Sequence, residues 1–235
     1  MILNKLISDE KQIIKLVVNS IEQESGSLVT YFNQYCFNKY YSDSDYRRII
    51  DEYFQVYADG IGIRIALKLF GFKVFSKFNA SDLNEKLLQL FISRSLRIYL
   101  VGGNFLPNLI SFYSNKLNIC GYANGFFDSD EEIILIQNIK NCAPDVIIVG
   151  MGVPRQELFS VKLSEKLNGK TIICVGNFLE FYFGTIKRIP KGLRNLGVEW
   201  VFRLIVEPRR LWKRYVIGIP IFFFLIIKEC LIKRK

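Results

Sequence analysis

The sequence predicts an α/β fold in which a mostly parallel sheet has helices on both faces. Short apolar runs alternate with segments of helical periodicity, and two of the runs, 145–152 and 170–177, are apolar almost without a break. Strands that are apolar on both sides are typical of parallel sheets with both faces covered. Half of the 235 residues are hydrophobic, so the chain can form the core of one large domain, alone or with an appendage.

The elements are expected to alternate along most of the chain. Strands are assigned to apolar runs that mostly end at or next to Gly or Asn, and helices to segments with capping residues or helical spacing. In the helix expected at 63–70, only Arg64 and Lys68 are polar, so we expect it to be buried on most sides. The predicted strands are 27–33, 54–58, 96–103, 118–123, 145–152 and 170–177, and the predicted helices are 42–53, 63–70, 105–116, 129–142 and 155–168.

Composition limits the functional classes. The formal net charge of +10 favours a polyanionic partner such as nucleic acid, a phosphate-bearing ligand or an anionic membrane surface. The chain has no histidine, which excludes His-based catalytic triads and His-ligated zinc sites. Its five cysteines are scattered without a CxxC pair, as is typical of reduced cytosolic thiols. The apolar segment at the N-terminus is too short for a signal peptide, so we expect a cytoplasmic protein.

The composition changes from about residue 186, where cations and aromatic residues become frequent. We therefore expect a core at 1–195 and a helical appendage at 196–235. The apolar run 216–227 has only twelve residues, whereas a membrane-spanning helix needs about 20. Basic residues flank it on both sides, which favours a segment lying in the membrane interface against anionic lipid. A helix docked on the core, an oligomer contact and a short or tilted anchor remain open alternatives.

Small and polar residues collect where predicted strands end. Ligands of open parallel sheets bind at the carboxyl ends of the strands, so these residues outline a plausible nucleotide site. Taken singly, each glycine is more often a tightly packed turn. The sequence "VGGNFLPN" lacks the third glycine of a dinucleotide-binding motif, and no GxxxxGK[ST] loop is present. The pairs in question are Asp59-Gly60, Gly102-Gly103, Gly150 with Gly152, and Gly176-Asn177.

Two short stretches have alternative interpretations. Asp59 follows an apolar strand and precedes a helix, so it is either a helix cap or a residue of the active centre. In "GMGVPRQE" (150–157), Pro154 suits the first turn of a helix whose backbone N–H groups could bind an anion. Gln156 and Glu157 in that turn are equally well explained as a capping arrangement.

Three motifs and their order resemble the WecG/TagA/CpsF family of bacterial glycosyltransferases. They are "YADGIGI", "GMGVPRQE" and "RIPKGLRNLGVEWVFRLIVEPRRLWKRY", and the resemblance runs from about Leu28 to Tyr215. It implies a Rossmann-like core and a C-terminal appendage that meets the membrane and completes the site. It also implies an inverting transfer from a UDP-sugar, usually an N-acetylhexosamine or its uronate, to a sugar on undecaprenyl diphosphate. No divalent metal or other cofactor is expected.

The resemblance also assigns residues. Asp59 matches the proposed general base, and Gly60 and Gly62 would let a sugar approach it closely. Lys77 stands where the family usually has arginine, and Glu180 where it usually has aspartate. The tail cations are expected to hold the diphosphate, with Lys213 and Arg214 as alternatives at one position. The candidate substrate-binding residues are Tyr31, Asn33, Gly60, Gly62, Lys77, Gly103, Gly152, Gln156, Glu180, Arg203, Arg210, Lys213 and Arg214.

The function expected from the resemblance is synthesis of a cell-surface polysaccharide such as capsule or teichoic acid at the inner face of the membrane. The alternative is a catalytically impaired, membrane-associated partner that binds a nucleotide sugar within an assembly complex. Nucleic-acid binding is disfavoured, because the cations cluster beside an apolar run rather than along a polar aromatic surface. A homo-oligomer is left open, since apolar surface beneath a detached tail would favour self-association.

Overall fold

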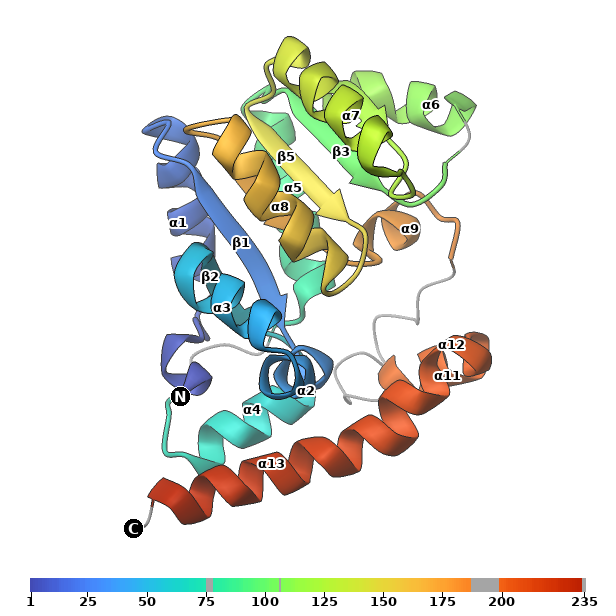
Figure 1. Cartoon of the computed structure of the whole chain (residues 1–235). Helices are drawn as coiled ribbons and strands as arrows, with labels where there is room; N and C mark the ends of the chain where they lie inside the picture. The colour runs from blue at the N-terminus through green and yellow to red at the C-terminus, as the bar shows by residue number, and fades with distance from the viewer. Residues whose placement is uncertain (75–77, 106, 187–198, 234–235) are drawn as a thin grey trace.

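The computed structural model describes residues 1–74, 78–105, 107–186 and 199–233. Its centre is a six-stranded sheet in the order β2-β1-β6-β5-β3-β4, and every neighbouring pair is parallel. The predicted α/β class is thus confirmed (Figure 1). The strands are β1 (Ser27–Phe32), β2 (Phe54–Ala58), β3 (Ile98–Gly102), β4 (Ile119–Ala123), β5 (Val146–Gly150) and β6 (Thr171–Cys174).

Helices cover both faces of this sheet. In Figure 1 some helices lie in front of the sheet, and the others of the core lie behind it or at its lower end. The helix α6 connects β3 to β4, and α8 connects β5 to β6 in the opposite direction along the sheet. Because connections between parallel strands are right-handed, these two helices lie on opposite faces. The front helices are α3 (Ser44–Tyr53), α7 (Ser129–Cys142) and α8 (Arg155–Lys166), and those behind are α1 (Glu10–Glu22), α5 (Ala80–Ser93) and α6 (Pro107–Leu117).

Several helices extend or add to the predicted set. The helix expected at 63–70 begins earlier and forms α4 (Gly60–Leu69). Two short helices that were not predicted, α2 (Gln34–Ser42) and α9 (Phe178–Tyr182), follow directly after the ends of β1 and β6, and a 3-10 turn (Ile2–Lys5) precedes α1. Neither α1 nor α5 was predicted either. The elements after β1, β2 and β6 therefore all start at the same edge of the sheet, where ligands are expected.

The prediction that α4 is buried on most sides is wrong. Ile61, Ile65 and Leu69 are 43%, 39% and 61% exposed, and their spacing of four residues places them in one row along the helix. The other side of α4 is buried through Ile63, Ala66 and Leu67. The reason is its position: α4 lies below the carboxyl edge of the sheet rather than against one of its faces (Figure 1).

The C-terminal part of the chain forms an arm of helices beneath this edge (Figure 1). The predicted boundary between residues 195 and 196 lies outside the described residues. The described part of the arm begins at residue 199 and is helical almost throughout, as expected. Its elements are α11 (Glu199–Val206), α12 (Pro208–Trp212), a π-helical turn η2 (Lys213–Ile217) and α13 (Gly218–Lys233).

One side of α13 is docked on α2. Phe222 is 1% exposed and its ring meets that of Phe37 at 5.1 Å between centroids. The Nδ2 of Asn38 donates to the Gly218 carbonyl at 2.6 Å. Nearer the C-terminus, Tyr41 and Glu229 share a side-chain hydrogen bond, which together with burial raises the pKa of the tyrosine. The alternative of a helix docked on the core thus describes this side of α13.

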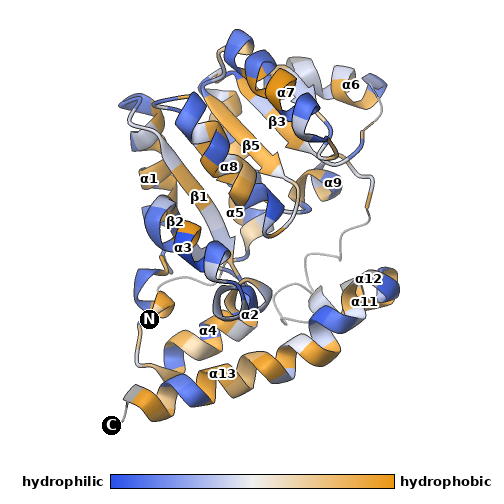
Figure 2. Ribbon diagram, viewed as in Figure 1, coloured by the Kyte–Doolittle hydropathy of each residue, from blue (hydrophilic) through white to orange (hydrophobic). Residues whose placement is uncertain are grey.

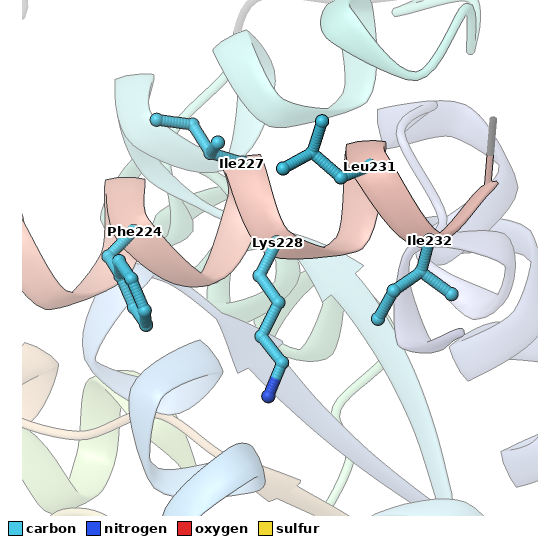
Figure 3. A pocket seen from close by; sticks show the side chains of 5 residues that line it. All are labelled: Phe224, Ile227, Lys228, Leu231 and Ile232. Atoms are coloured by element: carbon cyan, nitrogen blue, oxygen red, sulfur yellow. The ribbon is translucent and has the colours of Figure 1, made fainter. Parts of the chain in front are cut away.

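The outer side of α13 is apolar and exposed (Figure 2). Figure 3 shows part of it, where Lys228 is the one charged side chain around an apolar hollow of about 420 Å³. The expectation that the apolar stretch is too short to span a membrane needs correction. The continuous helix Lys213–Ile232 has 20 residues and a mean hydropathy of 2.2, enough to cross a membrane by length and composition. A core helix can pass the same test, so this is weak evidence for a span.

Candidate functional site

A cavity of about 480 Å³ lies where the core and the C-terminal arm meet. The core side is formed by the segments that follow β1 and β2, together with the start of α5. The arm contributes Trp200, Arg214, Tyr215 and Phe222 among others. The cavity thus opens at the carboxyl edge of the sheet and is closed on one side by the arm.

Asp59 lines this cavity and follows directly after β2. It occupies the N-cap position of α4, yet its side chain makes no capping hydrogen bond to that helix. Instead, its Oδ1 accepts a hydrogen bond from the backbone N–H of Ala80, the first residue of α5, at 2.9 Å. Its own N–H donates to the Phe32 carbonyl at 2.9 Å. Two segments far apart in sequence therefore orient the carboxylate, and its Oδ2 has no hydrogen bond among the described residues.

The glycines beside Asp59 have different surroundings. Gly60 has φ of +81°, and a Cβ built on it would meet nothing within 4 Å, so the backbone is open toward the cavity. A Cβ on Gly62 would lie 3.5 Å from the Phe222 ring. Gly60 thus fits the expected close approach of a substrate, whereas Gly62 lies at the contact of α4 with the arm.

Asn33 lines the same cavity from the end of β1. Its Oδ1 accepts hydrogen bonds from the backbone N–H groups of Tyr35 and Cys36 at 3.0 and 3.2 Å, which makes it the N-cap of α2. Asn33 is buried, and its Nδ2 has no partner among the described residues. The amide nitrogen is therefore left as a donor for a ligand.

Arg214 brings a cation into the cavity from the arm. Its guanidinium lies 4.7 Å above the Tyr35 ring, and its buried Nε has no hydrogen-bond partner within the described part of the chain. Lys213 is exposed and its Nζ lies 5.6 Å from the Trp212 ring, away from the cavity lining. Of the two alternatives at this position, Arg214 and not Lys213 thus lines the same cavity as Asp59.

Three other predicted cations cannot be placed. Lys77 lies outside the described residues. Arg203 and Arg210 belong to α11 and α12, but the placement of their side chains is not described.

Gln156 and Glu157 are fully buried, away from this cavity. The Nε2 of Gln156 donates to Glu157 Oε1 at 2.7 Å, and its Oε1 accepts from the Gly176 N–H at 3.0 Å. Thr30 Oγ1 also donates to Glu157 Oε1, at 2.9 Å. Burial raises the pKa of Glu157 to about 7. The capping interpretation is wrong, because Pro154 is the N-cap and no side chain caps α8. These residues instead join α8 to β1 and to the turn after β6.

Tyr31 is likewise buried rather than placed in the cavity. Its hydroxyl lies against Gly176, where a Cβ would come within 2.6 Å of the tyrosine oxygen. Burial raises its pKa well above the usual value. Side chains along a strand alternate between faces, so Tyr31 and Thr30 point to opposite sides of β1.

The remaining predicted residues lie farther along the carboxyl edge. Gly103 follows β3, Gly152 follows β5 and Glu180 lies in α9 after β6. The chain leaves β3 toward β4 and leaves β5 toward β6, in opposite directions, so the topological switch point lies between β3 and β5. Dinucleotide and nucleotide ligands of doubly wound sheets bind at such a point. The distance from β5 to β1 is two strand spacings, roughly 10 Å.

The sequence profile of the Glycosyl transferase WecG/TagA/CpsF family matches residues 2–235. The chain belongs to this family. It is a glycosyltransferase, and the family's role lies in the synthesis of cell-surface polysaccharides. The match covers more of the chain than the stretch from Leu28 to Tyr215 that carried the resemblance, because it includes the N-terminal helix and α13.

One curated relative is the N-acetylglucosaminyldiphosphoundecaprenol N-acetyl-beta-D-mannosaminyltransferase of Bacillus subtilis (strain 168). It is 26% identical to this chain over 214 residues, which cover 89% of this chain and 82% of the relative. The name of this relative gives a sugar linked through diphosphate to undecaprenol as the molecule that it modifies.

Sequence reasoning missed several residues that line the cavity. Gln34, Asn79 and Asp82 come from the first turns of α2 and α5 or their caps, and neither helix had been predicted. Arg64 was noticed only as a polar position on α4, although it lies little more than one turn from Asp59. Among the described residues, no group of three Cys, Asp or Glu side chains could hold a metal ion. Metal independence stays a prediction.

Proposed function

We propose that this glycosyltransferase moves an N-acetylhexosamine from a UDP-sugar to a sugar carried on undecaprenyl diphosphate, with inversion at the anomeric carbon. The observation that supports this most is the meeting of Asp59 and Arg214 in one cavity between the core and the arm. The relative's name supports a lipid-diphosphate sugar as acceptor and an N-acetylmannosamine unit as the group transferred.

In this proposal Asp59 accepts the proton of the attacking hydroxyl of the acceptor sugar. The Ala80 N–H fixes one carboxylate oxygen at 2.9 Å, which leaves the other for the hydroxyl. Holding the nucleophile in line with the anomeric carbon lowers the barrier further, because part of the entropy of alignment is lost on binding. Asn33, with its free amide nitrogen in the same cavity, would orient the sugar.

The leaving UDP carries negative charge, which a cation must stabilise in the absence of a metal. Arg214 is suited to this, since its guanidinium lies over Tyr35 and its Nε has no hydrogen-bond partner among the residues that the structure describes. The uridine would lie toward the switch point between β3 and β5, where a Cβ on Gly152 would meet nothing within 4 Å. At Gly103 the Phe105 ring packs against the backbone instead. One extended nucleotide sugar could then reach from that edge to Asp59.

The arm would also bring the enzyme to its lipid substrate. Its outer face is apolar, and cations flank it on both sides. We propose a peripheral position on the inner face of the cell membrane, with the arm against anionic lipid. Because the same arm lines the cavity, membrane docking and completion of the site would be coupled, which protects the nucleotide sugar from transfer to water.

The test is UDP release from a panel of UDP-sugars with a lipid-linked N-acetylglucosaminyl diphosphate as acceptor, in the presence of EDTA. We expect release with UDP-N-acetylmannosamine or a close N-acetylhexosamine, and retained activity in EDTA. A chain ending before Leu196 should lose transfer to the lipid acceptor. If the folded full chain releases UDP from no member of the panel, the proposal fails and an impaired binding partner becomes the better account.

A further inference from the structure

Arg64 is a second guanidinium in the cavity that holds Asp59, and nothing so far gives it a function. It lies on α4, the helix that begins directly after Asp59. Residues along an α-helix advance by about 1.5 Å each, so the backbone of Arg64 lies roughly 6 Å beyond that of Gly60. A single ligand can therefore contact both the carboxylate and this cation.

The guanidinium of Arg64 is only weakly bound by the protein. Its Nη1 donates to the Phe78 carbonyl at 3.5 Å, the limit of a hydrogen bond, and the side chain is partly buried. Within the part of the chain that the structure describes, it forms no ion pair. By contrast, cations on the outer surface such as Lys39, Lys86 and Lys162 each pair with a carboxylate within 3 Å.

A partly buried cation without a counter-ion costs free energy in the unliganded protein. Two carboxylates, Asp59 and Asp82, line the same cavity, but among the described residues neither forms an ion pair with Arg64. An anionic ligand group at Arg64 would supply the missing partner.

The exposed side of α4 next to Arg64 is apolar. In the row described above, Ile61 precedes Arg64 whereas Ile65 and Leu69 follow it, and Ile61 and Ile65 line the cavity. The arm lies alongside, since Phe222 contacts the position of Gly62, and Phe223 is 40% exposed next to it. Apolar side chains from two helices thus continue outward from the cavity mouth.

We propose that Arg64 binds the diphosphate of the lipid acceptor. Asp59, Arg64 and the exposed residues Ile65 and Leu69 follow one another along the start and length of α4, in the order of the sugar, diphosphate and polyprenyl chain of such an acceptor. The inference rests on the proposed function, because it assumes a lipid-diphosphate sugar as substrate. It leaves Arg214, on the arm, for the diphosphate of the donor.

The first experiment compares three full-length variants in steady-state kinetics. Arg64→Met should raise KM for the lipid-diphosphate acceptor by about 10- to 100-fold, with KM for the UDP-sugar and Kd for UDP changed less than about twofold. Arg64→Lys keeps the charge but not the planar fork, so its effect should be intermediate. Lys68→Met is the matched control: it removes a cation from the same helix that does not line the cavity, and both KM values should stay unchanged.

The second experiment replaces the acceptor rather than the enzyme. An alkyl glycoside of the same sugar, which lacks the diphosphate, should be a much poorer acceptor for the wild type, and Arg64→Met should lose most of that discrimination. If the discrimination stays unchanged, or if KM for the UDP-sugar rises instead, the inference is overturned.

Binding of farnesyl diphosphate separates this inference from the proposed function. It should bind Arg64→Met at least 10-fold more weakly than the wild type, and Lys68→Met normally. Equal binding to wild type and Arg64→Met overturns the inference even where no sugar transfer is observed. Absence of transfer together with the expected loss of binding would count against the proposed function alone.

Discussion

The buried carboxyl group of Glu157 should make the stability of this protein depend on pH. Glu157 is fully buried and accepts hydrogen bonds from Thr30 and Gln156 at Oε1, and its Oε2 has no partner in the described ranges. Burial raises its pKa from 4.5 to about 7. The variant Glu157→Gln keeps the shape and the accepting oxygen but cannot ionise.

The size of the effect follows from this shift. In the unfolded chain Glu157 loses its proton near pH 4.5, whereas in the folded protein it keeps it up to about pH 7. The folded state therefore binds more protons between these values, and the free energy of unfolding falls as pH rises through this window. A shift of this size corresponds to roughly 3 kcal/mol in total, all of it lost above pH 7.

Urea unfolding of wild type and Glu157→Gln between pH 4.5 and 8.5 measures this effect. The difference between the two proteins cancels the contributions of other titrating groups. We expect similar stability near pH 4.5, and a growing advantage for Glu157→Gln that levels off above pH 7. A difference that does not change with pH would refute the reasoning, because it would mean that Glu157 ionises with an ordinary pKa or finds a partner for its charge.

Two further predictions concern the arm. Arg214→Ala should lower kcat/KM on the order of 100-fold in the UDP-release assay, because a fixed donor to the leaving diphosphate is lost. Lys213→Ala, the control, should change kcat/KM by less than about threefold. Equal effects of the two variants would contradict the placement of Arg214. Phe222→Ala should weaken docking of α13 by about 3 kcal/mol or more, seen as faster proteolysis of the arm and lost transfer to the lipid acceptor. Phe224→Ala, which alters an exposed ring of the same helix, is its control, and an arm equally resistant in both variants would speak against the docked arrangement.

Much of the core could be predicted because its signals are local. The strand at 54–58 and the helix at 129–142 have the bounds expected from their apolar runs and caps. In contrast, α2 contains several aromatic residues and a cysteine, which are weak helix formers, and it is stabilised by the Asn33 cap and by α13. Contacts from distant segments override propensity there.

The site was predictable where the residue itself carries the chemistry. Asp59, Asn33, Gly60, Gly62 and Arg214 were singled out, and the structure brings them to one cavity. Whether a buried polar residue points to the cavity or to the core cannot be predicted from its neighbours in sequence. Gln156 bonds the backbone of Gly176, 20 residues away, and this tertiary contact turns it from the cavity to the core.

The exposed row on α4 shows the opposite limitation. A helix with few polar positions was expected to be buried, since apolar side chains usually leave water. The sequence does not show that α4 lies below the carboxyl edge of the sheet beside the arm. This position explains why Arg64 lines the cavity and why Ile61, Ile65 and Leu69 are exposed.

The central claim is that Asp59 is the base for glycosyl transfer, and Asp59→Asn tests it most directly. Asparagine can still accept the Ala80 N–H, so folding and the thermal midpoint should change little, and UDP should bind normally. We expect UDP release in the presence of lipid acceptor to fall by at least about 100-fold, the size of effect typical of a lost general base. Full activity in folded Asp59→Asn protein would show that Asp59 is not the base.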